Sequence, residues 1–158
     1  MSRPWIAWAR AASKGLAAVS AATAIWGCAH IVVLHDPLSA AEHNDLGVAY
    51  EAQGDARLAA REYRRALRMD PRMARARVNL GNLSAQAGRW SEAEGLYRRA
   101  LVDSPEDPDA MNNLAVALAR QHKRLDEAES LARRALAHSA GRDSVYRATL
   151  EEIHTVPR

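Results

Sequence analysis

The sequence repeats itself with a period of 34 residues from residue 40 onward. A leucine followed by glycine or alanine recurs at 46–47, 80–81 and 114–115, and the string YRRAL, or ARRAL in its last copy, recurs at 63–67, 97–101 and 132–136. The last spacing of that string is 35, so one residue is inserted near residues 122–125. Self-similarity at such a period indicates a solenoid of stacked units, because one unit cannot bury its apolar face without its neighbours.

Residue types at fixed places in the period indicate that each unit is a pair of helices. Alanine, leucine and arginine, all strong helix formers, dominate the composition, and phenylalanine is absent. Gly54 and Gly88 can adopt the left-handed conformation that ends a helix, while Pro71 and Pro105 stop the second helix of each pair. The segment Ser39-Ala40-Ala41-Glu42 has the sequence of a capping box, which predicts a helix that begins after Ser39.

Close approach of the two helices in a pair is predicted from small residues at facing positions, Gly47 with Ala59 and Gly81 with Ala93. We expect Tyr63 and Tyr97 to fill the gaps between pairs. The last pair leaves an apolar face that a further helix must cover. Residues 142–154 are predicted to form it, with Asp143 or Ser144 as N-cap and an apolar face of Val145, Tyr146, Leu150 and Ile153.

The repeated residues resemble the tetratricopeptide-repeat (TPR) family, whose pattern is a leucine–glycine pair, a tyrosine, then alanine, an aromatic residue, alanine and proline. Residues 40–73 carry this pattern in Leu46, Gly47, Tyr50, Ala59, Tyr63, Ala66 and Pro71. Residues 74–107 keep it, except that Ser84 replaces the first tyrosine, and residues 108–140 are degenerate, with Ala132 at the aromatic position. The resemblance implies an all-α fold, a right-handed superhelical solenoid of three TPR hairpins, followed by a capping helix and tail in residues 141–158.

Residues 1–27 have the layout of a bacterial export signal. They carry three basic residues and no acidic residue, and an apolar run fills residues 16–25. The sequence Ile25-Trp26-Gly27-Cys28 resembles the lipobox of bacterial lipoproteins, which implies cleavage before Cys28 and attachment of lipid to its thiol. Residues 28–39 are then a short membrane-proximal linker.

Two other interpretations of this segment stay open. Apolar residues resume at 31–34, so the run from 16 to 34 is near the length that spans a bilayer and could remain as an uncleaved signal anchor. Alternatively, the signal is cut elsewhere and Cys28 is a lone buried cysteine. All three interpretations predict a bacterial envelope protein whose repeats face the periplasm, with the outer membrane favoured over the inner.

The charge distribution argues against a nucleic-acid partner. The net charge of +3 equals the number of basic residues in the leader, so the rest of the chain carries as many basic as acidic residues. A folded part without net charge has no general attraction for phosphate. We interpret a basic stripe as the solvated face of a helix: Arg57, Arg61, Arg64, Arg65 and Arg68.

No catalytic or metal-binding pattern is present in the sequence. The six histidines lack metal-binding spacing, and no nucleophile elbow, P-loop or dinucleotide fingerprint occurs. Cys28 is the only cysteine, and acidic residues at 106, 107 and 109 suit the start of a helix. We therefore predict that the chain is not an enzyme and takes no cofactor, no metal and no small-molecule substrate.

The TPR resemblance implies that the inner, concave wall of the solenoid binds a protein or an extended peptide. That wall is predicted to present Asn44, Val48, Glu51, Asn79, Asn82, Gln86, Asn112, Asn113, Val116 and Arg120. Asparagine amides both donate and accept hydrogen bonds, as a peptide backbone requires. The lysine and arginine pairs with which one TPR subgroup holds C-terminal carboxylates are absent, so we do not expect a chaperone-tail role.

The leading hypothesis is a membrane-anchored adaptor that assists assembly of a secretion, pilus or cell-wall complex. Two alternatives are an accessory subunit that positions an envelope hydrolase or peptidase on another chain, and a structural protein that self-associates at the membrane surface.

Overall fold

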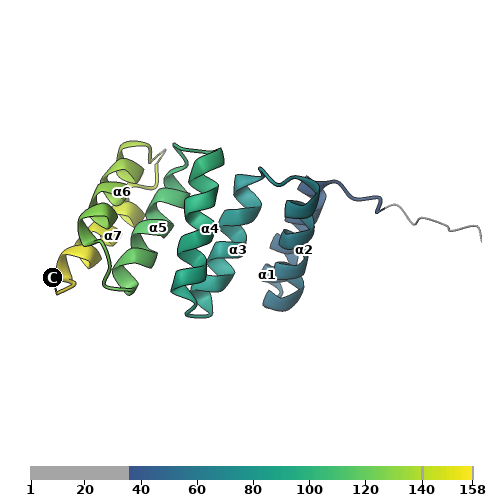
Figure 1. The fold of residues 1–158 in the computed structure, drawn as a ribbon, viewed down its shortest axis with the longest axis horizontal. Helices are drawn as coiled ribbons and strands as arrows, with labels where there is room; N and C mark the ends of the chain where they lie inside the picture. The colour runs from purple at the N-terminus through teal and green to yellow at the C-terminus, as the bar shows by residue number, and fades with distance from the viewer. Residues whose placement is uncertain (1–35, 140, 158) are drawn as a thin grey trace, which may run out of the picture. The chain divides into compact units, whose positions relative to one another are not determined.

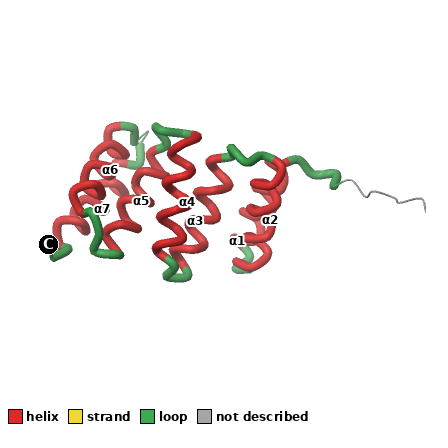
Figure 2. The backbone as a smooth tube through the Cα atoms, viewed as in Figure 1, coloured by secondary structure: helices red, strands yellow, loops and turns green. Residues whose placement is uncertain are grey.

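The computed structural model describes residues 36–139 and 141–157 (Figure 1). Helices and short connections make up this part of the chain, and it contains no strand (Figure 2). Its helices are α1 (Ala40–Ala52), α2 (Ala56–Met69), α3 (Ala74–Gln86), α4 (Trp90–Asp103), α5 (Pro108–Arg120), α6 (Leu125–Ala137) and α7 (Asp143–Thr155). The predicted signal segment and Cys28 lie outside the described residues.

The helices pack as three antiparallel hairpins in chain order, α1 with α2, α3 with α4 and α5 with α6. Each second helix also packs against the first helix of the next hairpin, and α7 covers α5 and α6 at the end of the stack. The prediction of an all-α repeat solenoid with a capping helix is confirmed.

Local signals begin and end these helices as predicted. The Ser39 hydroxyl accepts a hydrogen bond from the Glu42 N–H, and the Glu42 carboxylate accepts one from the Ser39 N–H at 2.7 Å, which completes the capping box. Gly54 and Gly88 have φ of +80° and +72°, the left-handed conformation that glycine adopts without steric cost.

The inserted residue lies in the connection between α5 and α6, which has four residues where the two earlier hairpins have three. Two non-glycine residues there, His122 and Arg124, have φ of 50° and 45°. A left-handed conformation at two side-chain-bearing residues costs free energy that a single glycine avoids. The longer connection still brings α6 back against α5, because the buried side chains of both helices pack in one cluster.

The capping helix α7 differs from the prediction at two points. Its N-cap is Arg142, without a side-chain capping hydrogen bond, and Asp143 and Ser144 belong to the first turn. Val145 is 53 % exposed, whereas Tyr146 is buried. Consecutive helical residues are separated by about 100° around the axis, so only one of this pair can face α5 and α6.

Two aromatic rings set the spacing inside the first two hairpins. Tyr63 is fully buried against Gly47, and Tyr97 is buried against Gly81. Tyr63 also packs with Leu80 of the next hairpin, so the rings fill space within a hairpin as well as between hairpins.

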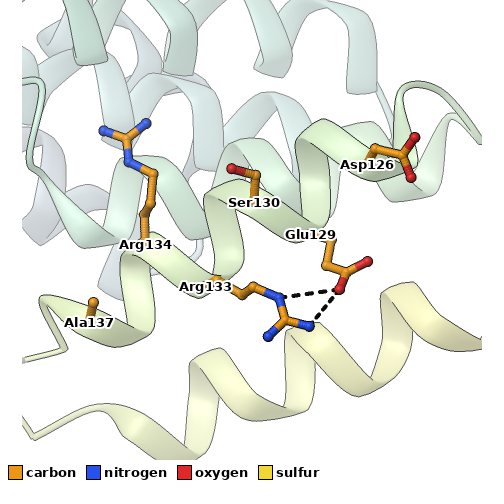
Figure 3. A pocket seen from close by; sticks show the side chains of 6 residues that line it. All are labelled: Asp126, Glu129, Ser130, Arg133, Arg134 and Ala137. Atoms are coloured by element: carbon orange, nitrogen blue, oxygen red, sulfur yellow. Dashed lines mark hydrogen bonds and ion pairs between the residues drawn. The ribbon is translucent and has the colours of Figure 1, made fainter.

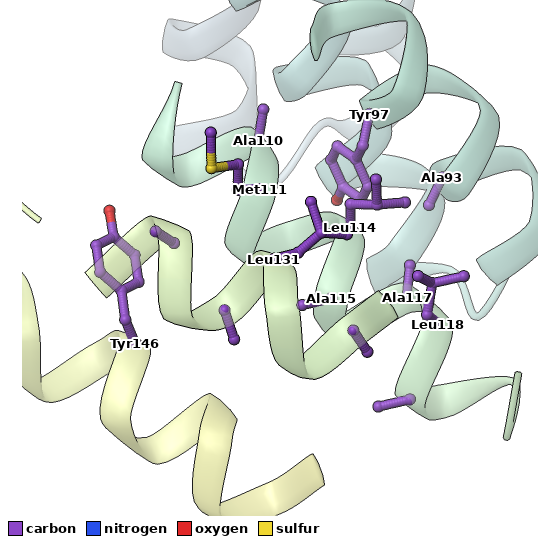
Figure 4. Close-up of a cluster of buried hydrophobic side chains, with 14 of the residues drawn as sticks. Ala93, Tyr97, Ala110, Met111, Leu114, Ala115, Ala117, Leu118, Leu131 and Tyr146 are labelled. Atoms are coloured by element: carbon purple, nitrogen blue, oxygen red, sulfur yellow. The ribbon is translucent and has the colours of Figure 1, made fainter. Parts of the chain in front are cut away.

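In the third hairpin the same two positions hold Ala115 and Ala132, and both are fully buried. A larger residue replaces glycine where a smaller residue replaces tyrosine, so the facing volumes compensate. Figure 4 shows the cluster in which Tyr97, Leu114 and Leu131 pack together from three successive helices. Among the described residues, both apolar clusters and the partly buried residues packed against them lie between Tyr50 and Val156, and residues 36–158 form one compact unit.

Candidate partner-binding groove

The ten predicted binding residues all lie on the first helices of the three hairpins, α1, α3 and α5. We use the name "groove" for the surface that these ten residues define on α1, α3 and α5. Several of its polar side chains are bonded to one another across hairpins, which the sequence did not predict.

The first cross-hairpin bond joins two amides of α1 and α3. Asn79 Nδ2 donates to Asn44 Oδ1 at 3.0 Å, and Asn44 Nδ2 donates to Asp45 Oδ1 at 3.2 Å. Asn44 is only 2 % exposed, so its side chain is not accessible to a ligand and instead orients the Asn79 side chain through this hydrogen bond.

The second cross-hairpin bond joins α3 to α5. Asn82 Oδ1 accepts hydrogen bonds from Asn113 Nδ2 and from the Tyr97 hydroxyl, both at 2.9 Å. Two donors saturate the lone pairs of this carbonyl oxygen. In the described part of the chain, Asn82 Nδ2 and Asn113 Oδ1 have no hydrogen-bond partner. A free donor and a free acceptor therefore remain side by side on the groove.

A third group of contacts fixes Glu51. Its carboxylate accepts from the Tyr63 hydroxyl at 2.8 Å and from Gln86 Nε2 at 3.3 Å. Burial, and then the hydrogen bond to Glu51, raise the pKa of Tyr63, so its hydroxyl stays a donor well above neutral pH. Glu51 and Gln86 are consequently held in place at the α1–α3 end of the groove.

An open cavity of about 360 Å³ lies between the second and third hairpins. Its lining consists of Asn82, Ala85, Gln86, Trp90, Tyr97, Asn113 and Val116. Three of these residues were not predicted from the sequence: Ala85 of α3, and Trp90 and Tyr97 of α4, a second helix that the prediction of the wall did not include. The Trp90 indole adds an aromatic wall to this cavity.

Arg120 connects the cavity to the capping helix. Its guanidinium lies 5.9 Å from the centroid of the Trp90 ring, within the range of a cation–π contact. The same group forms an ion pair with Glu152 of α7 at 2.8 Å. Two predicted residues lack such contacts and present apolar surface: Val48 is exposed and Val116 is half-buried.

Asn112 is placed differently from its neighbour Asn113. It is 5 % exposed, and its Oδ1 is buried without a hydrogen-bond partner among the described residues. Asn112 occupies the repeat position of Asn44, whose Oδ1 is satisfied by Asn79 of the next hairpin. The residue of α7 that corresponds to Asn79 is Ala148, which has no side-chain donor.

A buried ionic cluster, also missed from the sequence, fixes the first turn of α1. His43 is fully buried, with Nδ1 2.8 Å from the Glu62 carboxylate of α2 and Nε2 3.0 Å from the Asp36 carboxylate. The Leu38 N–H, and then Arg65 and His43, hold the pKa of Asp36 below its usual value. Burial raises the pKa of Glu62, but hydrogen bonds from His43 and Arg61 outweigh it and leave that pKa lowered.

The described residues also bear on metal binding and on membrane spanning. No group of three or more histidine, cysteine, aspartate or glutamate side chains in residues 36–139 and 141–157 is placed to hold a metal ion. Among those residues, no helix has both the length and the apolar character needed to cross a bilayer.

Comparison with known protein families gives a match to a family described as "Tetratricopeptide repeat". Its two matched ranges, residues 44–108 and 85–143, together cover well over half of the chain. In curated proteins, the chain is 40 % identical over 96 residues to a Drosophila melanogaster protein named Protein O-mannosyl-transferase Tmtc1. The match covers 58 % of this chain and 11 % of that protein, so the chain spans about a tenth of the relative's length.

Solved structures of TPR domains share the fold. One is the first TPR of Spaghetti (RPAP3) bound to the HSP90 peptide SRMEEVD, with a TM-score of 0.69 at 19 % identity over 77 % of this chain and 95 % of that one. Another is the NMR structure of the first TPR domain of the human RPAP3 protein, with the same TM-score, identity and share of this chain and 94 % of that chain.

Proposed function

The chain belongs to the tetratricopeptide-repeat family, and from that premise we propose that it is an adaptor which binds an extended segment of a partner protein in its groove. A repeat solenoid of this family is a scaffold for protein–protein interaction. The proposal adds the place and the mode of binding, and it takes the chain to have no catalytic activity of its own.

One observation carries the proposal: Asn82 Nδ2, a donor, and Asn113 Oδ1, an acceptor, stand together on the rim of the cavity, and no other described residue binds either atom. A peptide unit offers the matching pair, one carbonyl and one N–H. The cavity beside them, walled by Trp90 and Val116, has room for an apolar side chain of the same segment. The hydrogen bonds to the peptide backbone and the burial of the apolar side chain would both add affinity, and the cavity would select that side chain.

The solved neighbour binds an HSP90 peptide, which ends in acidic residues. We do not extend that ligand to this chain. The groove holds Glu51 in place by two hydrogen bonds, and Arg120 is already paired with Glu152. An apolar segment read through its backbone suits these residues better than an acidic tail does.

A direct test starts from peptides selected against the folded fragment 36–158 from a displayed random library. Asn82→Ala and Asn113→Ala should each weaken the selected peptides roughly fivefold, since a net hydrogen bond contributes about 1 kcal/mol. Trp90→Ala should weaken them more, because it removes the apolar wall. Gln53→Ala with Ser130→Ala, both exposed and outside the groove, is the matched control. Equal affinity of the groove variants and the control would reject the site.

We further propose that the adaptor is held at a bacterial membrane and acts in the periplasm on a secretion, pilus or cell-wall complex. The support is the order of residues in the leader: basic start, apolar run, and Cys28 at a lipobox-like junction. Mass spectrometry of the membrane-extracted protein should find an acylated N-terminal cysteine. An intact leader on the mature protein would instead establish the signal anchor, and a free, unprocessed protein in the soluble fraction would overturn both.

A second candidate function is favoured by the relative named as an O-mannosyl-transferase, of which the matching segment forms only 11 %. In such a protein the repeats accompany a much larger chain. The present chain would then be an accessory subunit that positions a separate envelope hydrolase or peptidase. A rise in kcat/KM of a genetically linked hydrolase on addition of the chain would favour this function, and binding without any change in rate would favour the adaptor.

A further inference from the structure

Helix α2 carries an unusual charge for a helix of this solenoid. Five arginines follow one another at helical spacing along its exposed side: Arg57, Arg61, Arg64, Arg65 and Arg68. We call them the basic face. The only acidic residue of the helix, Glu62, is buried and bonded to His43 and Arg61. The solvent side of α2 therefore presents positive charge alone.

The repeat fold itself does not require this charge, because the other two hairpins lack it. The corresponding residues of α4 are Ser91, Gly95, Arg98, Arg99 and Val102, and those of α6 are Asp126, Ser130, Arg133, Arg134 and Ala137. Three of the five arginines in α2 thus replace neutral or acidic residues in the other copies.

A carboxylate that neutralises the shared arginine is also missing from α2. In α4, Glu94 pairs with Arg98 at 3.0 Å, and in α6 Glu129 binds Arg133 at 2.6 Å (Figure 3). The same position in α2 is Ala60, so Arg64 has no such partner within its helix. Helix α2 therefore differs from α4 and α6 in two ways: it has three more arginines at these positions, and it lacks the glutamate.

Three members of the basic face are available to an external anion. In residues 36–139 and 141–157, no carboxylate forms an ion pair with Arg57, Arg64 or Arg68. At longer range, and after the larger effect of Arg89, Arg64 helps to hold the pKa of Glu92 below its usual value. Within the described part of the chain, its guanidinium donors nevertheless form no hydrogen bond.

The remaining two arginines are bonded close to the start of the solenoid. Arg61 binds the buried Glu62, and Arg65 forms an ion pair with Asp36. Asp36 follows the apolar run of residues 16–34 by two positions in the sequence. The apolar run that we propose as the membrane segment thus ends two residues before Asp36, which pairs with Arg65 of the basic face.

We propose that the basic face is a second membrane contact, which binds anionic lipid headgroups and orients the solenoid on the bilayer surface. A guanidinium binds phosphate in a forked geometry, and arginines near an anionic leaflet each add to the attraction. The groove lies on α1, α3 and α5, so lipid on α2 leaves it open to a partner. The inference rests on the proposed membrane attachment for the identity of the anionic surface.

The test uses the folded fragment 36–158, which lacks the leader and so isolates the basic face. Sedimentation with vesicles compares phosphatidylcholine alone with equal parts phosphatidylcholine and phosphatidylglycerol, at low and high salt. The wild-type fragment should bind only the anionic vesicles, and less at high salt. The variant Arg57→Gln/Arg64→Gln/Arg68→Gln should bind them on the order of a hundredfold more weakly, from roughly fivefold for each arginine.

The control variant Arg99→Gln/Arg134→Gln/Arg147→Gln removes three exposed arginines elsewhere and should keep most of the binding. Equal loss in both variants would overturn the proposal, because net charge alone would then explain the binding. Absence of wild-type binding, or tighter binding to a DNA oligonucleotide or an acidic peptide than to anionic vesicles, would also overturn it. None of these results touches peptide binding in the groove or the chemistry of Cys28, so the failure of either proposal can be told from the other.

Discussion

The contact between Gly81 and Tyr97 allows a sharp test of what sets the spacing of the hairpins. A Cβ added at Gly81 would lie 2.5 Å from Tyr97 Cε1 and 3.0 Å from its Cδ1 and Cζ, whereas carbon atoms in contact prefer about 3.5–4.0 Å. The Tyr97 ring cannot move away to relieve this clash, because the side chain is 2 % exposed and its hydroxyl is hydrogen-bonded to Asn82. Gly81→Ala must therefore overpack the hairpin.

The expected size follows from two opposing effects. Alanine in place of glycine stabilises a helix by about 1 kcal/mol, and overpacking a core costs about 1–3 kcal/mol. A clash of this depth against an immobile ring belongs at the upper end, so Gly81→Ala should lower the free energy of unfolding by about 2 kcal/mol. Gly95 in α4 is the control, because a Cβ there meets nothing within 4 Å. Gly95→Ala should raise the same quantity by about 0.5–1 kcal/mol.

Urea denaturation of the fragment 36–158, followed by circular dichroism at 222 nm, measures both variants. A third background completes the cycle: in Tyr97→Ala the ring is gone, as at Ala132 of the third hairpin, so adding Gly81→Ala should now stabilise by about 1 kcal/mol. If Gly81→Ala proves as stable as Gly95→Ala in the wild-type background, the tyrosine does not set the helix spacing and the reasoning fails.

Three further predictions concern the buried polar groups. Asn112→Val should stabilise the fragment by about 1–2 kcal/mol in urea titrations, because it removes a buried oxygen that has no partner among the described residues and introduces the residue that α3 has at the same position, Val78. The same change at Asn44, whose oxygen is hydrogen-bonded, should destabilise the fragment. Equal effects of the two changes would contradict the argument. The pKa of Glu62 is lower in the folded state than its usual value of 4.5, so the cluster's stabilisation is present above about pH 5 and is lost as the pH falls through the folded pKa. Between pH 7 and pH 4, the free energy of unfolding should therefore fall further in the wild type than in Glu62→Gln, and an equal fall in both would refute the linkage. Burial, and then the 2.9 Å hydrogen bond to Asp109, raise the pKa of the Tyr146 hydroxyl to about 12. Tyr146→Phe removes this hydrogen bond and should lower the melting temperature of the fragment by about 4 °C. An unchanged melting temperature would show that the bond does not hold α7 in place.

The features that could be predicted from the sequence are those that depend on a few neighbouring residues. The capping box at Ser39 and the helix-ending glycines follow from local conformational preference, and both are confirmed. The 34-residue period can be seen in the sequence itself and predicts the stacked hairpins. The N-cap of α7 was wrong because three polar residues stand in a row there, and the sequence alone does not say which one leaves the helix.

The arrangement of the groove could not be predicted because it depends on the rotation between hairpins. Asn79 bonds a residue 35 positions earlier, but Asn113 bonds one 31 positions earlier, so a fixed period does not yield the pairs. For the same reason the sequence placed Asn44 and Asn112 on the wall, whereas both are buried. His43 and Glu62 are separated by 19 residues in the sequence, and only the α1–α2 packing joins them.

Differences between the three hairpins separate what the fold needs from what the surface adds. The third hairpin exchanges glycine and tyrosine for Ala115 and Ala132, and the two changes compensate each other because they face the same space. Arg57, Arg64 and Arg68 of α2 have no such compensation among the described residues, because only Arg61 and Arg65 of the five pair with a carboxylate and Ala60 stands where the other copies have glutamate. Like charges at helical spacing destabilise a helix unless something outside it binds them. An uncompensated cost in one copy, absent from two others of the same chain, points to an anion at that surface.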